Sequence, residues 1–303
     1  MSAEATVLFD APGPRARRRY LIITIVTLLV LAGALAATVY GLRVQLGARN
    51  WLPFVEAPTW THYMIPGLLG TLQAAIIAVV LASILGILLG VGRLSSLKVI
   101  SIPAGIFVEF FRAVPVLIMM LFAYYVMLFN QLMTGYMLLL ASVVIGLTLY
   151  NASVIAELIR SGVHSLPRGQ AEAGLAVGLT RGQTLSAIQL PQAIRAMLPS
   201  LVSQLVVILK DSALGYMIGY AELLRASQTL ASVRGNLMVS FIVAGFIFVV
   251  LNYGLTGLAQ WLERRMSRRT SAGGQGGAAA APVGVTEGVV VAAADSAGPA
   301  DRQ

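Results

Sequence analysis

Charged side chains inside long apolar runs are the residues of this 303-residue sequence that could do chemistry. Lys210 and Asp211 are neighbours in a stretch that is otherwise almost entirely apolar. A charge at the centre of a membrane span costs about 2.5–3.5 kcal/mol on translocon scales, so it needs a partner or a water-filled cavity. An amino-acid zwitterion needs a cation or amide donor for its carboxylate and an acceptor for its ammonium group. The side chains that could supply such groups along a solute path are Lys210, Asp211, Asn151, Ser153 and Glu157.

Two acid–base pairs repeat one helical spacing. Glu109 precedes Arg112 by three residues, and Glu157 precedes Arg160 by the same step. Residues three apart lie on one face of a helix, so each pair is expected to form an ion pair. One interpretation is that these pairs only hold helices together at the membrane surface. The other gives them, together with Pro115, a part in gating, and the sequence leaves both open.

The sequence lacks the residues for cysteine chemistry and the usual motifs for metal and nucleotide binding. The sequence has no cysteine, which excludes disulfides, thiolate catalysis and cysteine-ligated metals. His62 and His164 are far apart and stand in no H-x-x-x-H or H-E-x-x-H pattern, so no metal site is expected. No G-x-x-x-x-G-K-[ST] stretch occurs, and we therefore expect the chain to bind no nucleotide itself.

The composition indicates a membrane protein. Hydrophobic residues make up 58% of the chain and charged residues only 11%, against about 25% charged in soluble domains. Inside a bilayer only helices and closed barrels satisfy every backbone group. The apolar runs here are long and continuous, whereas barrel strands are short and alternate, so an all-α polytopic membrane protein is expected. The formal charge of +9 is then typical of basic cytoplasmic loops, and no nucleic-acid partner is expected.

Six transmembrane helices are predicted from the uncharged runs. No residue is charged between Ala113 and Ala156, which is enough chain for two spans and a polar turn. The fifth span is predicted to begin near Ser200 and to meet Lys210 and Asp211 midway through its length. The predicted spans are 20–42, 67–91, one that ends near Phe129, 136–158, one that begins near Ser200, and 236–262.

The basic N-terminus, residues 1–19, precedes the first span. A cleaved signal peptide is the alternative for that span, because Ala34–Ala36 has the small-residue pattern of a cleavage site. The apolar stretch of this span exceeds the about 7–15 residues of a usual signal-peptide apolar region, which favours a retained helix. The segment 43–65 carries Trp51 and Trp60, and such rings favour the membrane–water interface on the outer side.

Charge asymmetry predicts the orientation of the chain. With the N-terminus inside, only Arg43, Arg49, Arg225 and Arg234 among the basic residues of the loops lie outside. This satisfies the positive-inside rule, so both termini and the segment 159–199 are expected in the cytoplasm. The tail 263–303 begins with arginines and becomes rich in Gly and Ala, which is typical of a disordered appendage.

The polar segment 159–199 is predicted to form two short helices around a glycine turn. Thr180 and Gln183 have the spacing of a capping box. Gly178, just before them, can take the left-handed conformation that ends a helix. A break is expected at Leu190–Pro191, because proline lacks an amide donor and disfavours helix at the residue before it. An ordinary amphipathic loop on the lipid headgroups is the alternative for this segment.

Glu172 is the only acid of that segment, and the residues around it form a recognisable pattern. Glu172-Ala173-Gly174, then Gly178, then Ile188-x-Leu190-Pro191 resembles the EAA loop of bacterial ABC-importer permeases. That pattern is EAA, three residues, Gly, nine residues, Ile, one residue and Leu-Pro, and every spacing matches. Gly174 departs from it, since the third residue is usually alanine, and glycine lowers helix propensity by about 1 kcal/mol. We call residues 159–199 the EAA loop.

The resemblance extends from about Pro66 to Leu262. The stretch VEFFRAVPVLIMMLF, residues 108–122, is similar to the FRGTP segment of the polar amino-acid permeases. The extra N-terminal span resembles that of actinobacterial glutamate permeases. The resemblance implies the type I ABC importer permease fold, with a five-helix core, residues 66–262, behind the N-terminal span.

The resemblance also implies the partners. Two permease subunits, of the same or a homologous chain, form the path for a polar amino acid, with glutamate as the best candidate. A separate cytoplasmic ATPase dimer binds ATP and Mg, and an extracytoplasmic binding protein delivers the solute. The chain is then a transport subunit of the bacterial cell membrane and no enzyme. By this resemblance Glu172, Ala173, Gly174 and Gly178 form the docking surface for the ATPase, while Ile188, Leu190 and Pro191 shape the returning chain.

Two other functions are alternatives to this one. An ion-coupled secondary transporter is disfavoured, because no internal repeat is visible in the sequence. An intramembrane enzyme is disfavoured too, because no nucleophile or metal constellation occurs within the spans.

Overall fold

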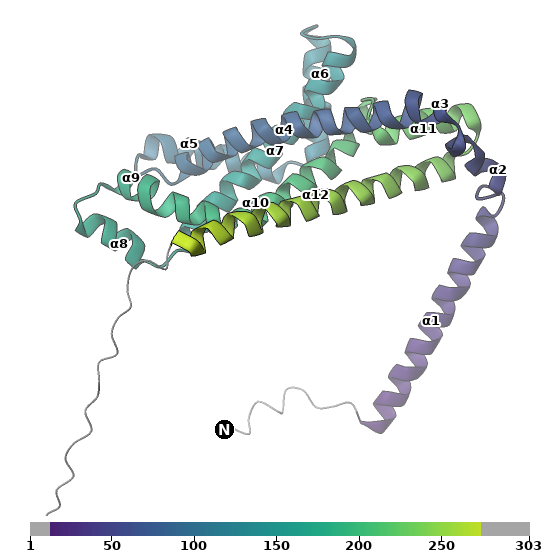
Figure 1. Cartoon of the computed structure of the whole chain (residues 1–303), viewed down its shortest axis with the longest axis horizontal. Helices are drawn as coiled ribbons and strands as arrows, with labels where there is room; N and C mark the ends of the chain where they lie inside the picture. The colour runs from purple at the N-terminus through teal and green to yellow at the C-terminus, as the bar shows by residue number, and fades with distance from the viewer. Residues whose placement is uncertain (1–12, 274–303) are drawn as a thin grey trace, which may run out of the picture. The chain divides into compact units, whose positions relative to one another are not determined.

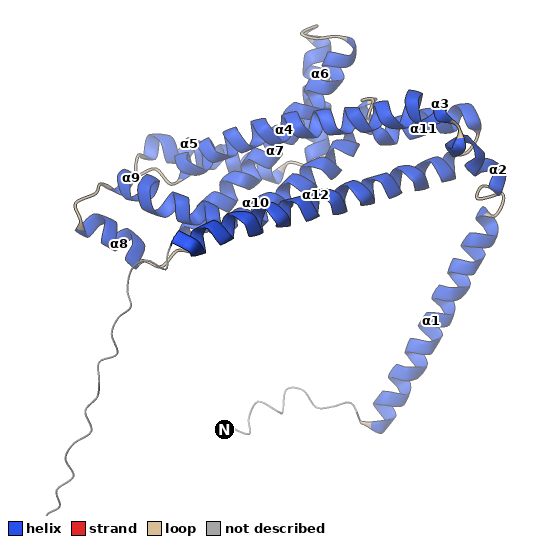
Figure 2. Cartoon of the chain, viewed as in Figure 1, coloured by secondary structure: helices blue, strands red, loops and turns tan. Residues whose placement is uncertain are grey.

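The structure is a computed structural model that describes residues 13–273, and every regular element in that range is a helix (Figure 1, Figure 2). Five helical stretches are long and apolar enough to cross a membrane, or six when one bent pair of helices counts as a span. This range agrees with the six spans expected from the sequence. The chain is an all-helical, multi-pass membrane protein.

The long helices alternate with shorter ones that connect or extend them. The long ones are α1 (Pro14–Leu42), α4 (Ile65–Arg93), α7 (Gly135–His164), α10 (Leu190–Asp211) and α12 (Leu237–Gly273). The bent pair is α5 (Lys98–Ala113) and α6 (Val116–Phe129). The short elements are α2 (Ala48–Trp51), η2 (Leu52–Val55), α3 (Ala57–Thr59), η3 (Trp60–Met64), α8 (Gly169–Ala176), α9 (Arg181–Thr184), η4 (Leu185–Gln189), η5 (Ser212–Ile218) and α11 (Leu223–Arg234).

The centre of the bundle is the contact between α4 and α7. One face of α4 carries a small residue at every fourth position, and this face is buried. Small residues let two helix backbones approach closely, which is the usual way helices associate in lipid. A Cβ added at Gly86 would come within 2.7 Å of Ile155, and one added at Gly70 would collide with the Ala221 carbonyl. The buried small residues of this face are Gly70, Ala74, Ala78, Ala82, Gly86 and Gly90.

The third span differs from the prediction. Its helix α6 ends at Phe129, as expected, but has 14 residues. At 1.5 Å per residue this is about 21 Å, less than the roughly 30 Å of the hydrocarbon core. Helix α5 precedes it at an angle of 102°. The cause is Pro115, which drives the residue before it out of the helical region, so that Val114 is extended and α5 ends.

The predicted break at Leu190–Pro191 and the predicted start of the fifth span near Ser200 are wrong. A continuous helical stretch runs over 181–218, through α9, η4, α10 and η5. The π-helical turn η4 directly precedes α10, and the Leu190 amide donates to the Leu185 carbonyl. Pro191 therefore stands in the first turn of α10, where a missing donor is tolerated. Lys210 and Asp211 end α10 and lie near the far end of this stretch, not midway.

The segment 43–65 is held against the corner between α11 and α12. Arg234 forms an ion pair with Glu56, and the Asn236 side chain donates to the Asn50 carbonyl at 3.0 Å. Met64 is buried against Leu223 and Leu230 of α11. Glu56 is thus an acid in an exposed ion pair at the opposite end of α4 from Arg93.

Candidate functional site

The first helix of the EAA loop is α8, and hydrogen bonds of its own backbone end it. The Gly178 amide donates to the Leu175 carbonyl at 3.0 Å, and the Leu179 amide donates to the Gly174 carbonyl at 3.1 Å. These two bonds form a Schellman motif, which needs a left-handed residue at its turn. Gly178 has φ +86°, so the predicted glycine turn is confirmed.

The second helix of the EAA loop begins with the predicted capping box. The Thr180 side chain accepts a hydrogen bond from the Gln183 amide at 3.3 Å, and the Gln183 side chain accepts from the Thr180 amide at 2.9 Å. Two of the free amides at the helix start are thereby satisfied. A fixed turn between two capped helices gives α8 a defined direction relative to α10.

The two helices of the EAA loop pack closely against each other at Gly174. It is buried, and a Cβ at this position would stand 2.5 Å from the Thr184 methyl carbon and 3.1 Å from the Ile188 Cδ1. Thr184 is itself 2% exposed. The departure from the EAA pattern therefore has a physical reason here: the branched Thr184 side chain occupies the space that an alanine methyl would need.

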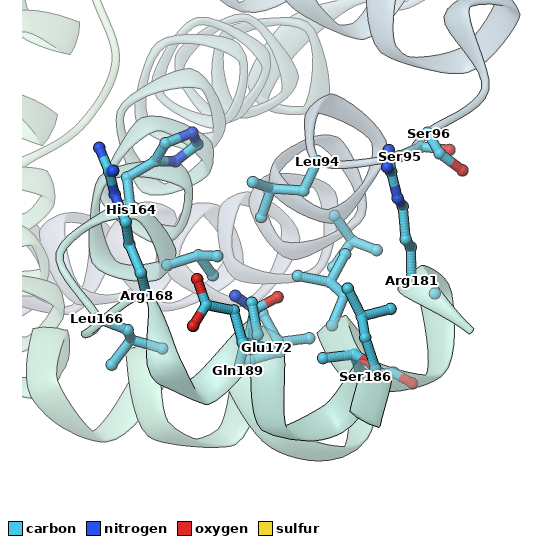
Figure 3. Close-up of a pocket in the computed structure, with 18 of the residues that line it drawn as sticks. Leu94, Ser95, Ser96, His164, Leu166, Arg168, Glu172, Arg181, Ser186 and Gln189 are labelled. Atoms are coloured by element: carbon cyan, nitrogen blue, oxygen red, sulfur yellow. The ribbon is translucent and has the colours of Figure 1, made fainter. Parts of the chain in front are cut away.

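An open pocket of about 830 Å³ lies between α8 and the ends of α4 and α7 (Figure 3). Glu172 and Leu175 line it from α8, and Leu190 lines it from the start of α10. In Figure 3, Arg181 lies on the side of this pocket near Ser95 and Ser96. Within the described residues, no hydrogen bond or ion pair of Glu172 is found, and this carboxylate is exposed. It is free for a partner of opposite charge. We call this space the loop pocket.

The predicted loop residues divide into two groups. Glu172 and Leu190 line the loop pocket, with Gly174 and Ile188 in contact range beside them. Ala173, Gly178 and Pro191 are exposed and lie outside the lining.

Both predicted acid–base pairs exist, and one arginine joins them into an ion cluster. Glu157 binds Arg160 at 2.6 Å, and Glu109 lies 3.7 Å from Arg112. Arg93, the last residue of α4, binds Glu157 at 2.8 Å and Glu109 at 2.9 Å. Arg112 also reaches Glu157, at 3.4 Å. The ion cluster thus consists of Arg93, Glu109, Arg112, Glu157 and Arg160, from α4, α5 and α7.

The polar residues predicted to line a solute path do not gather at one place. Asn151 is fully buried, donates to the Leu147 carbonyl and accepts from Gln204 of α10 at 2.6 Å. The Ser153 hydroxyl donates to the Leu149 carbonyl of its own helix. Glu157 belongs to the ion cluster. These three side chains have their partners inside the bundle.

Lys210 and Asp211 differ from these three. The Lys210 side chain is exposed and that of Asp211 is half-buried. Neither has a hydrogen bond or ion pair within the described part of the chain. A lysine in a membrane-spanning stretch that has no partner among the described residues points to a water-filled path or to another molecule.

Three residues with clear roles were not singled out from the sequence. Arg93 joins the two acid–base pairs, Gln204 satisfies Asn151, and Thr184 packs on Gly174. Arg93 and Gln204 stand 64 and 53 residues from these partners along the chain, and no local pattern marks such contacts. Among residues 13–273, no three His, Asp or Glu side chains gather closely enough to hold a metal ion.

Known proteins resemble the chain over most of its length. It is 48% identical over 222 residues to the glutamate transport system permease protein GluD of Corynebacterium glutamicum, which covers 73% of this chain and 81% of the relative. It is 33% identical over 208 residues to the glutamate/aspartate import permease protein GltK of Escherichia coli O157:H7, covering 67% of this chain and 93% of the relative.

Solved structures give the same architecture. The crystal structure of an amino acid ABC transporter with histidines matches with a TM-score of 0.64 at 28% identity, over 71% of this chain and 98% of that one. An inward-facing MetNI methionine ABC transporter matches in fold with a TM-score of 0.58 at 18% identity, over 69% and 98%. The family model for the binding-protein-dependent transport system inner membrane component matches residues 82–268, and the chain belongs to that family.

Proposed function

We propose that this chain forms the translocation path for glutamate or a closely similar acidic amino acid in an ATP-driven importer. The observation that supports the solute most directly is the 48% identity to a glutamate transport permease. A second relative carries glutamate and aspartate in its name at 33% identity. Two relatives that share an acidic solute favour the same chemical class here.

The EAA loop is the docking surface for a separate ATPase, which binds ATP and Mg. Glu172 supports this role, because its carboxylate is exposed at the loop pocket and has no partner within the described residues, while hydrogen bonds fix the end of α8 and the start of α9. Ala173 is exposed beside it, and Gly178 holds the turn. Glu172 then supplies a charge, and Ile188, Leu190 and Pro191 carry the force into α10.

The orientation follows from the same assignment. An ATPase works in the cytoplasm, so the EAA loop and both termini lie there, and the segment 43–65 faces outward. An extracytoplasmic binding protein delivers the solute to that outer side. A second permease subunit, a copy of this chain or a homologous one, completes the path in the bacterial cell membrane.

Lys210 and Asp211 contact the solute along this path. The exposed Lys210 ammonium suits a carboxylate of an acidic amino acid, and Asp211 suits its ammonium group. Both lie in the helical stretch 181–218, whose other end carries the EAA loop. Movement of the loop therefore reaches these residues through continuous helix.

Replacing Lys210 with methionine is expected to reduce uptake of labelled glutamate about 10- to 150-fold, because one charge-assisted hydrogen bond of about 1.5–3 kcal/mol is lost. ATP hydrolysis without solute should stay unchanged, since the site lies far along α10 from the loop. Lys98→Met is the matched control, because Lys98 is exposed at the start of α5 and is the other lysine of the sequence. Normal uptake and normal solute-stimulated ATP hydrolysis in Lys210→Met would show that Lys210 does not contact the solute.

The function as a whole is tested by reconstituting the permease with its ATPase and binding protein in proteoliposomes. We expect uptake of labelled glutamate that requires ATP and that excess unlabelled glutamate or aspartate suppresses. Uptake that persists without ATP and follows an imposed ion gradient would instead support a secondary transporter. ATP-dependent uptake of a neutral or basic amino acid, but not of glutamate, would show that the solute belongs to another class. It would still support an ATP-driven importer.

A further inference from the structure

The ion cluster ties three helices together through one shared carboxylate. The Glu157 carboxylate forms ion pairs with Arg93, Arg112 and Arg160. The Arg93 guanidinium also forms an ion pair with Glu109 and so bridges two carboxylates. Arg93 and Glu157 are the best-shielded members, with side chains 13% and 22% exposed. A guanidinium that bridges two carboxylates fixes its position better than a single ion pair does. These two residues are therefore the centre of the cluster.

One side of the ion cluster adjoins the EAA loop. Arg93 is followed directly by Leu94, Ser95 and Ser96, which line the loop pocket. Arg160 lies one helical turn before His164, which ends α7 and lines the same pocket. A displacement of α8 that closes or opens the loop pocket thus acts directly on the chain next to Arg93 and Arg160.

The other side of the ion cluster adjoins the bend between α5 and α6. Glu109 and Arg112 lie in the last turns of α5, and the chain bends by 102° around Val114–Pro115. An open groove of about 480 Å³ runs along this bend, lined entirely by apolar side chains such as Phe110, Phe122 and Leu149. Within the described residues, α6 contacts α7 through apolar packing without hydrogen bonds, as at Met120, which is buried against Gly146 and Leu147. The ion pairs of the cluster hold the end of α5 against α4 and α7.

We propose that Arg93 and Glu157 are positioning residues that transmit movement of the EAA loop to the bend between α5 and α6. This proposal rests on the coupling role of the EAA loop. The cluster links the pocket that changes with ATPase movement to a helix pair that is otherwise held by apolar packing. Without it the ATPase still docks and hydrolyses ATP, but the α5–α6 bend no longer follows the loop.

The test is the number of solute molecules imported per ATP hydrolysed, measured in proteoliposomes with the ATPase and binding protein. For Glu157→Gln we expect this ratio to fall about fivefold, with hydrolysis retained, as for residues that carry coupling between sites. Glu56→Gln is the matched control, because it removes the acid of an ion pair at the other end of α4 and should leave the ratio unchanged. Equal losses of uptake and hydrolysis in Glu157→Gln, with a constant ratio, would overturn the proposal.

A second measurement follows the bend itself. The chain has no cysteine, so Phe122→Cys on α6, 71% exposed, provides a single labelling site. We expect ATP to change its labelling rate in the otherwise unaltered complex and to have no effect when Glu157→Gln is added. An ATP effect that survives Glu157→Gln, or none in the unaltered complex, contradicts the proposal.

Should Glu157→Gln fail to assemble, Arg93→Lys keeps the charge but loses the fork that bridges two carboxylates, and the same fivefold fall is expected. A complex without substitutions that shows no ATP-driven uptake would refute the proposed function. A complex that imports normally, beside a Glu157→Gln variant with an unchanged ratio, would refute only the role of the ion cluster.

Discussion

Reversing the charge of Glu172 to lysine is expected to reduce ATP-dependent uptake about 30-fold or more, because removing one member of a buried charge pair at an interface costs about 2–5 kcal/mol. Glu172 has no partner of its own within the described chain and stands exposed at the loop pocket. Its loss should therefore leave the permease folded and remove a contact to the ATPase. Binding of the purified ATPase to the permease in nanodiscs measures the loss of this contact directly.

Glu56→Lys is the control for this charge reversal. Glu56 is an exposed acid of the segment 43–65, so the variant carries the same change of charge far from the EAA loop. It should bind the ATPase normally. Full ATPase binding and uptake by Glu172→Lys would refute the docking role and return the EAA loop to the alternative of a helix on the lipid headgroups.

Local signals in the sequence predicted the glycine turn and the capping box of the EAA loop. The capping box at Thr180 and the left-handed Gly178 depend on residues within three or four positions of each other, and both were found as expected. The membrane spans depend on composition over about twenty residues, and the number of spans was predicted on the same basis. Such features are fixed before any tertiary contact forms.

Features that depend on tertiary contacts or on an unusual backbone turn were missed. Pro191 predicts a break by its own chemistry, but the π-helical turn at Leu185–Gln189 accommodates it, and nothing in the residue types marks that turn. Arg93 lies just beyond the predicted span 67–91, and only the packing of α4 on α7 brings it to Glu157. Asn151 and Ser153 were candidates for the solute path, yet nearby groups of the bundle satisfy both.

One signal for the packing of α4 was present in the sequence. Small residues recur at every fourth position from Gly70 to Gly90, and this spacing marks a face for close helix contact. The pattern would have placed α4 at the centre of the bundle. It would not have identified α7 as its neighbour, since the large residues that fill the opposite face, such as Ile155 and Ile159, look like those of any span.

Replacing Gly174 with alanine is expected to weaken ATPase binding about 5- to 150-fold, the equivalent of about 1–3 kcal/mol for overpacking. Two effects oppose each other here. Alanine raises helix propensity by about 1 kcal/mol in α8. Its methyl group, however, meets the Thr184 side chain at 2.5 Å, and a buried, β-branched threonine has no other rotamer to adopt cheaply. The clash outweighs the gain, so α8 tilts and presents Glu172 in the wrong place.

The double variant Gly174→Ala with Thr184→Ala separates these effects. The Thr184 hydroxyl is buried without a hydrogen-bond partner within the described residues, so its removal costs no hydrogen bond. The methyl group introduced by Gly174→Ala then fills the space that the Thr184 side chain leaves, and ATPase binding should return to the level of the unaltered chain. Gly182→Ala is the matched control in the same loop, because a Cβ there meets nothing within 4 Å and should not weaken binding. If Gly174→Ala bound the ATPase as tightly as the unaltered chain, the glycine would be a neutral departure from the EAA pattern. If the double variant failed to restore binding, the contact with Thr184 would not be the reason for the glycine.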